Sequence, residues 1–250
     1  MIGDVGSLLR VRRYPVKSML GEELETAAEV TGRGITGDRT HALIDAETGK
    51  ICSAKNPRLW AGMLALAGAA ALSATDEELS HALGRPVRLV STPPEGATLD
   101  RARPDEILAK GIEAEVGFDV SRVAPGTFFD FAPLHMVTSA TIERLKIKDI
   151  IRYRPNLVLD LNLDETGLTG QTLHIGESLR VRVIVPTPRC AIPTLAHGGL
   201  PRDLDALRVP SQHNRMPVLD LGMLACVGVY AEVLQPGRVI VGDSVRVVAH

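Results

Sequence analysis

The sequence predicts a mainly β fold of the α+β class, with β-barrel architecture and a few short helices. Three observations lead to this prediction. Strand-like runs are short and numerous, helical patterns are few, and turns rich in glycine and proline separate the runs. The 250 residues, 45% of them hydrophobic, suffice for one large domain or two small ones with a substantial core.

The N-terminal part combines strands with one clear helix. We expect strands at residues 24–30, 40–45 and 87–90, with a turn at 32–34 and a hairpin at 47–49. Thr75 can cap a helix that runs to Leu83, because Glu78 occupies the capping-box position and Gly84 can end the helix. Residues 91–105 are rich in proline and charge, which predicts a linker or surface loop. We therefore expect a domain boundary near residue 100.

The C-terminal part combines one predicted helix with further strands. A helix is predicted at 139–147, entered through Thr138 or Ser139, and a buried strand at 156–161. A turn region begins at residue 164. Apolar and basic residues alternate from residue 179, which predicts a strand that Pro186 and Pro188 then end. Residues 239–248 predict two strands interrupted at 242–243.

Cys190 is the residue with the clearest chemical potential. It follows the predicted strand on a stiff, proline-rich segment, with Arg189 beside it. A neighbouring guanidinium favours thiolate over thiol, and a thiolate attacks electrophiles or binds soft metals. These residues alone leave nucleophile and metal ligand equally open.

Two N-terminal pairs offer cations and a hydroxyl. Lys17 and Ser18 follow a proline and suit an anionic phosphate, although a solvated turn explains them as well. Asp38 could orient Arg39 toward an anion, or the two could form an exposed ion pair.

Further candidate groups precede the predicted buried strand. Arg152, Arg154 and Asn156 alternate, so in an extended chain they would point to one side and could bind a phosphate and a heterocycle edge. Ser139 would open a helix whose free N–H groups suit phosphate, or it is an ordinary N-cap.

Composition excludes several classes of protein. Only 3% of residues are aromatic and the net charge is -2, which argues against nucleic-acid and anionic-membrane partners. The three cysteines form no CxxC pair, and no signal peptide or spanning segment is evident, so we expect a cytoplasmic protein. The glycines at 32, 34 and 37 match a dinucleotide fingerprint by letter, but a strand-like run follows instead of a helix. No GxSxG, Walker A or HExxH pattern occurs.

Five short motifs follow one another along the chain, and their order is informative. They are Tyr14-Pro-Val-Lys-Ser18, Gly37-Asp-Arg39, Arg154-Pro-Asn156, Arg189-Cys190 and Val241-Gly-Asp-Ser-Val245. In this order they resemble a MOSC-domain protein with its N-terminal β-barrel domain, MOSC being named after the C-terminal domain of molybdenum-cofactor sulfurase. The mitochondrial amidoxime-reducing component and its bacterial counterparts have a similar layout. The resemblance covers nearly the whole chain. It implies a mainly β (α+β) fold with a smaller N-terminal β-barrel-like domain at 8–95 and a MOSC β barrel at 105–249.

The resemblance implies a bound molybdenum cofactor (molybdopterin) and an oxidoreductase that reduces N-hydroxylated or N-oxide compounds. Cys190 would ligate molybdenum and be the catalytic residue. The resemblance places the remaining site residues near the pterin, its phosphate and its tail: Lys17, Ser18, Arg39, Ser139, Arg154, Asn156 and Arg189. It also implies a small-molecule substrate and a separate electron-transfer protein, and it carries a family-level association with pyridoxal phosphate.

One segment departs from the family pattern. Reductase-like members usually continue after the cysteine with an Asp-Pro-x-Thr-Gly segment, whereas residues 193–199 contain no acidic residue here. Residues 194–215 could form a different lid. Two alternatives therefore stay open: a carrier that holds a persulfide on Cys190, and a binding module without the cofactor.

Overall fold

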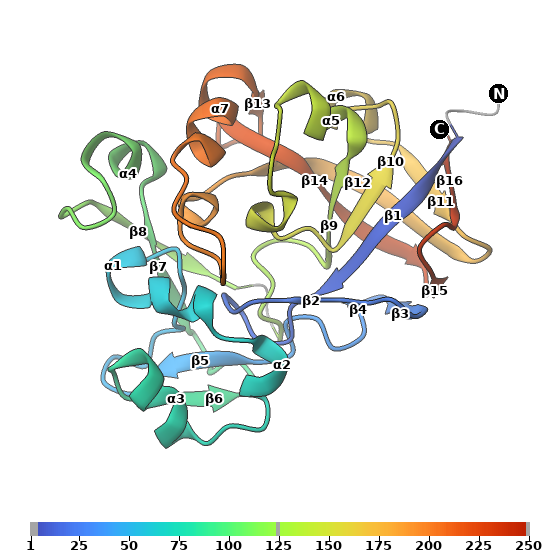
Figure 1. Ribbon diagram of the computed structural model, residues 1–250. Helices are drawn as coiled ribbons and strands as arrows, with labels where there is room; N and C mark the ends of the chain where they lie inside the picture. Colours follow the sequence, from blue (N-terminus) through green and yellow to red (C-terminus); the bar gives the residue numbers. More distant parts are fainter. Residues whose placement is uncertain (1–4, 124–125, 249–250) are drawn as a thin grey trace.

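A closed seven-stranded barrel is the largest unit of the computed structural model, which describes residues 5–123 and 126–248 (Figure 1). Around the barrel the strands follow in the order β10 (Leu157–Asp160), β9 (Leu134–Thr138), β14 (Met223–Gln235), β12 (Leu179–Pro188), β11 (Thr172–Ile175), β16 (Ser244–Val248) and β1 (Val5–Arg13). β1 pairs back onto β10, which closes the barrel. β9 and β10 are parallel, and the other pairs around the ring are antiparallel. The mainly β prediction is confirmed.

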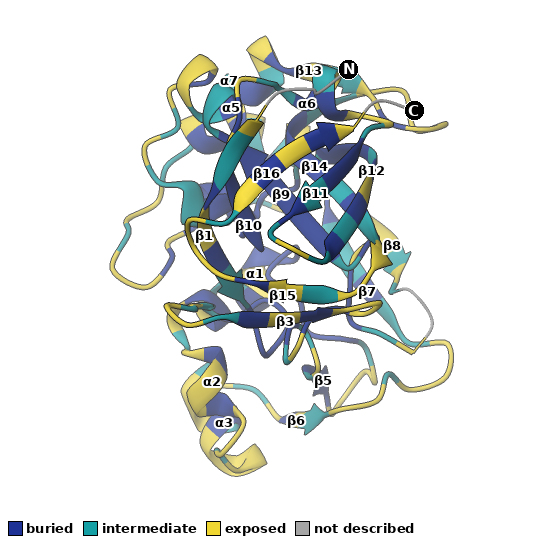
Figure 2. Cartoon of the chain, turned by 90° about the vertical axis from the view of Figure 1, so that its right-hand side faces the viewer, coloured by how far each residue is buried: buried dark blue, intermediate teal, exposed yellow. Residues whose placement is uncertain are grey.

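The alternation in the sequence explains the barrel core. Leu179, Val181 and Val183 of β12 are buried, whereas Arg180 and Arg182 between them are more exposed. β16 alternates in the same way (Figure 2). Because successive strand residues face opposite sides, one apolar set fills the barrel.

The predicted end of β12 is wrong. The strand continues through Pro186 and Pro188, which lie opposite Val229 and Cys226 of β14. The register shifts in this part of the ladder, and β11 accompanies β12 only as far as Arg182. Proline is tolerated at such irregular, one-sided positions because the missing N–H removes no regular ladder bond. Cys190 therefore follows the end of a longer strand.

A smaller lobe lies at the lower left of Figure 1. It contains β5 (Ala42–Asp45), β6 (Val87–Val90), α1 (Pro57–Trp60), the 3-10 helix η1 (Ala61–Ala65), α2 (Gly68–Ala71) and α3 (Asp76–Leu83). The capping box of Thr75 and Glu78 is present, and Gly84 ends α3 in the left-handed conformation, as predicted. Trp60, Met63 and Leu43 belong to the core of this lobe.

Residues 98–102 correct the linker prediction. They form β7 (Thr98–Ala102), which pairs with β8 (Phe118–Arg122), and α4 (Pro104–Lys110) lies between the two strands. Ala102 and Ile107 pack in one cluster with Cys190 and Leu195. The unit formed by β7, α4 and β8 therefore packs against the segment that carries Cys190. The division into domains at 8–95 and 105–249 stays a prediction. β1, at the N-terminal end of the chain, belongs to the large barrel.

The remaining elements are short: β2 (Glu22–Glu23), β3 (Ala28–Thr31), β4 (Gly34–Ile35), α5 (Ser139–Arg144), η2 (Ile150–Tyr153), α6 (Glu165–Leu168), η3 (Ile192–Thr194), α7 (Asp205–His213), β13 (Arg215–Pro217) and β15 (Gly237–Val239). The strand predicted at 24–30 is reduced to β3, and the turn region at 164 contains α6. Thr138 caps α5 as predicted, since its Oγ1 accepts from Thr141 N at 3.3 Å. Of the two strands predicted in 239–248, the second is β16, whereas the first lies earlier in the chain than predicted, as β15.

Candidate functional site

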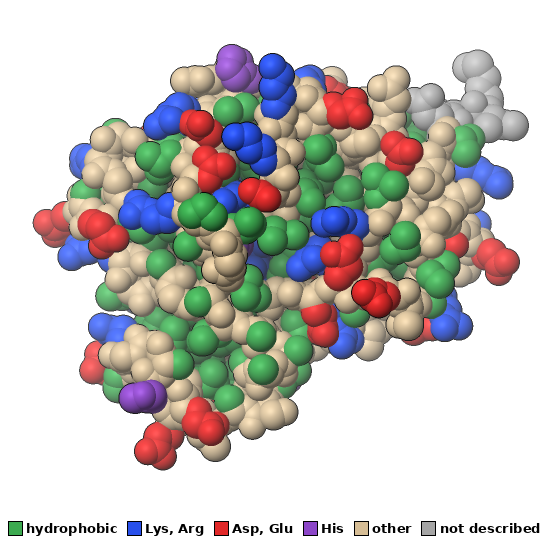
Figure 3. All heavy atoms as spheres, in the orientation of Figure 1, with side chains coloured by type: hydrophobic (Ala, Val, Ile, Leu, Met, Phe, Trp, Pro, Cys, Tyr) green, Lys and Arg blue, Asp and Glu red, His purple; other side chains and the backbone are tan. Residues whose placement is uncertain are grey.

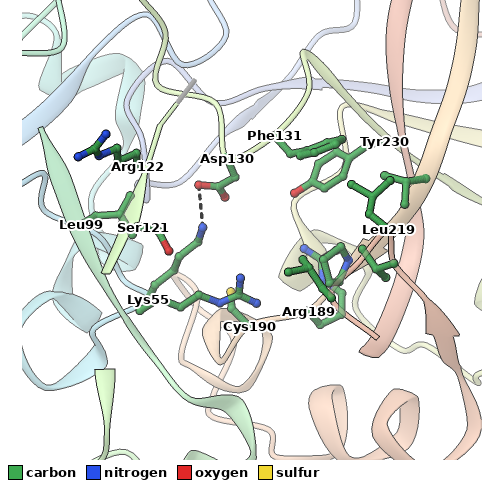
Figure 4. Close-up of a pocket in the computed structure, with 15 residues that line it drawn as sticks. Lys55, Leu99, Ser121, Arg122, Asp130, Phe131, Arg189, Cys190, Leu219 and Tyr230 are labelled. Atoms are coloured by element: carbon green, nitrogen blue, oxygen red, sulfur yellow. Dashed lines mark ion pairs between the residues drawn. The ribbon is translucent and has the colours of Figure 1, made fainter. Parts of the chain in front are cut away.

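Two adjoining cavities meet at Cys190. The smaller, of about 50 Å³, contains most of the predicted site residues, and the larger, of about 160 Å³, is drawn in Figure 4. The side chains that line both are Lys55, Asp130, Arg189, Cys190 and Tyr230. The cysteine therefore lies where a cation-rich cavity opens toward a larger one.

Lys17 is buried instead of solvated. A tight turn places it there, with Ser18 in the left-handed conformation at φ 63°. Lys17 Nζ donates to Phe128 O at 2.8 Å and to Asp130 Oδ1 at 2.6 Å, and Lys55 Nζ lies 2.8 Å from the same Oδ1. Two ammonium groups thus share one carboxylate. Ser18 lines the smaller cavity beside them.

The charges of this cluster are mutually dependent. Burial lowers the pKa of Lys17 to about 8, although Asp130 acts in the opposite direction. Burial also acts to raise the pKa of Asp130, but Lys17 and Lys55 outweigh it and hold that pKa well below its usual range. The cluster carries a net positive charge at neutral pH, because two cations face one anion.

Arg39 is half-buried and anchored by Asp38, so the two do not form an exposed ion pair. Asp38 is buried, pairs with the Arg39 guanidinium and accepts from Tyr14 N at 2.6 Å. The Arg39 guanidinium lies 5.0 Å from the centre of the Tyr14 ring. Asp38 therefore orients Arg39 toward the cavity.

Arg154 contributes a further cation to the smaller cavity, and its side chain is buried. It is 8% exposed, its Nη1 donates to Met19 O at 2.6 Å, and its guanidinium lies 4.2 Å from the centre of the Tyr14 ring. Its Nη2 is buried and has no hydrogen-bond partner among the described residues. Burial lowers the pKa of Arg154 to about 10, so that it stays charged at neutral pH. A buried donor without a partner is expensive, and an anion in the cavity would satisfy it.

The alternation predicted for residues 152–156 is wrong in its geometry. Residues 150–153 form η2, and Arg154 has φ 57°, so the chain is not extended. Arg152 lines the smaller cavity, but its guanidinium donates to Leu195 O at 3.0 Å and Pro201 O at 2.7 Å. These bonds hold the atypical segment 193–199 in place, and Pro193 of that segment lines the smaller cavity.

Two predicted residues lie outside both cavity walls. Asn156 is 1% exposed, and its amide joins strands by donating to Arg12 O at 3.2 Å and accepting from His135 N at 3.1 Å. Ser139 Oγ donates to Asp160 Oδ1 at 2.9 Å. Asn156 reaches the site only indirectly, because Arg39 Nη1 lies 3.4 Å from its Oδ1.

Arg189 lines both cavities but is tied to the barrel. Its Nη1 lies 3.3 Å from His135 Nε2 and donates to Val227 O at 3.2 Å. Within 5–123 and 126–248, no hydrogen bond joins this guanidinium to the Cys190 thiol. Burial, reinforced by Arg189, lowers the pKa of His135 to about 3, so this imidazole is neutral.

Lys55, Asp130 and Tyr230 were not predicted from the sequence. Burial raises the pKa of Tyr230 to about 12, which keeps its phenol protonated. In Figure 4 its hydroxyl points into the larger cavity. Local sequence around these three residues carries no motif, so only the folded chain brings them together.

The described residues include no group of three or more His, Cys, Asp and Glu side chains that could hold a metal ion. A metal at Cys190 would need its other ligands from a cofactor. In the described part of the chain, no helix has the length and apolar character needed to cross a membrane. Figure 3 shows acidic and basic side chains interspersed on the visible face.

A closed barrel with a cysteine beside a buried cationic cavity defines a protein suited to an anionic, metal-carrying cofactor. Comparison of the sequence with known families identifies the chain as a MOSC-domain protein: the MOSC domain matches residues 127–246, and the MOSC N-terminal beta barrel domain matches residues 5–101. The MOSC family is associated with the molybdenum cofactor.

Solved structures give more distant similarities. The YuaD protein from Bacillus subtilis is 11% identical, with all of both chains covered and a TM-score of 0.48. YiiM from Geobacillus stearothermophilus is 18% identical, with 47% of this chain and 55% of that one covered and a TM-score of 0.32. No curated protein matches the sequence significantly.

Proposed function

We propose that this chain is a molybdenum-cofactor-dependent oxidoreductase that reduces N-hydroxylated or N-oxide compounds, with Cys190 as the protein's ligand to the metal. The observation that carries the proposal is the position of Cys190, where the cation-rich cavity adjoins the larger one. The reaction consumes two electrons and two protons and releases water, and a separate electron-transfer protein would supply the electrons.

The residues present fit an anionic pterin cofactor. The buried Nη2 of Arg154 lacks a hydrogen-bond partner among the described residues, and Lys17, Lys55 and Arg39 add positive charge to the same cavity. We assign the phosphate to this cation cluster. When bound, the cofactor supplies two dithiolene sulfurs and a redox-active metal, so the protein needs to give only one soft thiolate.

The larger cavity would take the substrate. Tyr230 Oη keeps its proton at neutral pH, because burial raises its pKa to about 12, and can donate to the oxygen of a bound substrate. Cys190, 5% exposed, is sheltered from bulk solvent between the two cavities.

Metal analysis tests this proposal directly. Protein made in a host that synthesises the cofactor should contain molybdenum near one atom per chain, and Cys190→Ala should reduce it to background. Cys226→Ala is the matched control, because Cys226 is fully buried in a cluster with Val185 and Val218. Equal molybdenum in the Cys190 and Cys226 variants would contradict the proposal. In a metal-free preparation, intact mass distinguishes a persulfide carrier, with added sulfur on Cys190, from a binding module with an unmodified thiol.

Anion binding should weaken as pH rises through about 8. Lys17 is charged below its pKa of about 8 and neutral above it, so the cavity loses one positive charge. Calorimetry with inorganic phosphate on the metal-free protein should give weaker binding at pH 9 than at pH 7. Lys17→Arg keeps its charge over this range and should remove most of the difference. An unchanged pH dependence in that variant would exclude Lys17 as its source.

A further inference from the structure

The larger cavity has two chemically different walls, and neither contains a residue that we assigned to the cofactor. Figure 4 shows Leu99, Ser121 and Arg122 on one side, Phe131, Tyr230 and Leu219 on the other, and Cys190 between them. The volume is about 160 Å³. Since an engineered cavity of about 150 Å³ binds benzene, this space suits a single ring or a short alkyl chain.

One wall is apolar and unusually exposed. Residues 218–222 form the turn between β13 and β14, in which Leu221 N donates to Val218 O at 2.9 Å. Leu219 is 62% exposed and Leu221 is 61% exposed, although such turns usually carry polar residues. Leu219 also adopts the left-handed conformation, with φ 49°, which is strained for leucine. Exposed leucines held in a strained turn beside a cavity indicate contact with an apolar ligand.

The opposite wall provides cations without partners. Leu99 and Arg101 are two residues apart on β7 and face the same side, and Ser121 lies opposite Leu99 on β8. Neither Arg101 nor Arg122 forms an ion pair with any residue that the structure describes. The nearby Asp119 pairs with Arg103 at 3.4 Å instead. Two unpaired guanidinium groups at a cavity wall favour a carboxylate.

We propose that this cavity is a substrate chamber for single-ring or short-chain N-hydroxylated compounds that carry a carboxylate. The apolar body lies against Leu219, Leu221 and Phe131, and the carboxylate faces Arg101 and Arg122. The N–O group is then directed to Cys190. The N-hydroxy part of this inference rests on the proposed function, whereas the selection of apolar carboxylates depends on the chamber alone.

Calorimetry on the purified chain tests the chamber with three matched probes: phenylacetate, phenylethanol and phenethylamine. We expect phenylacetate to bind at least about tenfold more tightly than the alcohol, since a hydrogen bond to a charged group contributes roughly that factor. The amine should bind most weakly. The double variant Arg101→Gln, Arg122→Gln should abolish the preference for carboxylate. Arg88→Gln, at an exposed arginine of β6, should preserve it.

Leu219→Asn should weaken phenylacetate and phenylethanol alike, because it alters the apolar wall and leaves the charges in place. Equal binding of the three probes, or a preference that survives the double arginine variant, would overturn the inference. Molybdenum content separates this result from the proposed function. A chain that holds molybdenum but shows no carboxylate preference refutes the chamber alone, and a metal-free chain that prefers phenylacetate supports the chamber and refutes the proposed function.

Discussion

Gly228→Ala is expected to destabilise the fold by about 2 to 5 kcal/mol, because backbone strain and steric overlap add at one position. Gly228 has φ 76°, and a Cβ there would lie 2.3 Å from Met136 O and 2.7 Å from His135 Nε2. Met136 O is a backbone atom of β9, which pairs with β14 along this stretch, so it cannot move without disturbing the barrel. Chemical denaturation followed by circular dichroism measures the loss.

Gly84→Ala separates the two contributions. Gly84 has φ 66°, close to that of Gly228, but nothing lies within 4 Å of its would-be Cβ. This control variant should lower the free energy of unfolding by only about 1 to 2 kcal/mol, the strain of an alanine in the left-handed conformation. Equal losses in the two variants would mean that the barrel relaxes around a methyl group at Gly228. The Gly228 variant should also disturb His135, and with it the position of Arg189.

The barrel was predictable because its signal is local. The alternation around Arg180 and Arg182 in β12, and that along β16, records which side of each strand meets the core. The end of β12 and the strand β7 were predicted wrongly, because they depend on contacts between segments far apart in the sequence. Whether proline ends a strand depends on its neighbours across the sheet, and a single sequence does not state them.

The candidate site was predictable in its cations and not in its carboxylate. Lys17, Arg39 and Arg154 lie in recognisable motifs, and the fold brings all three to one cavity. Asp130 lies between phenylalanines without a motif, and its role depends on Lys17 and Lys55, which are far away in the sequence. Long-range ion pairs of this kind follow from tertiary packing. Ser139 shows the converse: Thr138 caps α5, and the Ser139 hydroxyl bonds to Asp160 and Leu161 instead of lining either cavity.

Arg154→Met is expected to separate binding from stability. In the metal-free protein, the buried Arg154 guanidinium leaves its Nη2 without a hydrogen-bond partner among the described residues, and burial lowers its pKa to about 10. Replacing such a charge with an apolar side chain of similar length is often neutral or stabilising. The loss of the hydrogen bond from Nη1 to Met19 O acts in the opposite direction, so the melting temperature should fall only slightly. Phosphate affinity should fall by about tenfold or more, because a charged hydrogen bond to the anion is lost.

Arg152→Met is the matched comparison, since Arg152 lies two residues away in the same turn but donates to Leu195 O and Pro201 O. Its removal leaves buried carbonyl groups unsatisfied, so this variant should lower the melting temperature. Thermal denaturation and phosphate calorimetry on both variants decide the matter. If Arg154→Met instead lowers the melting temperature as much as Arg152→Met does, and phosphate affinity is retained, Arg154 is a structural residue. A clearly smaller loss of melting temperature in Arg154→Met than in Arg152→Met, together with lost phosphate affinity, would identify Arg154 as a charge kept mainly for an anionic ligand.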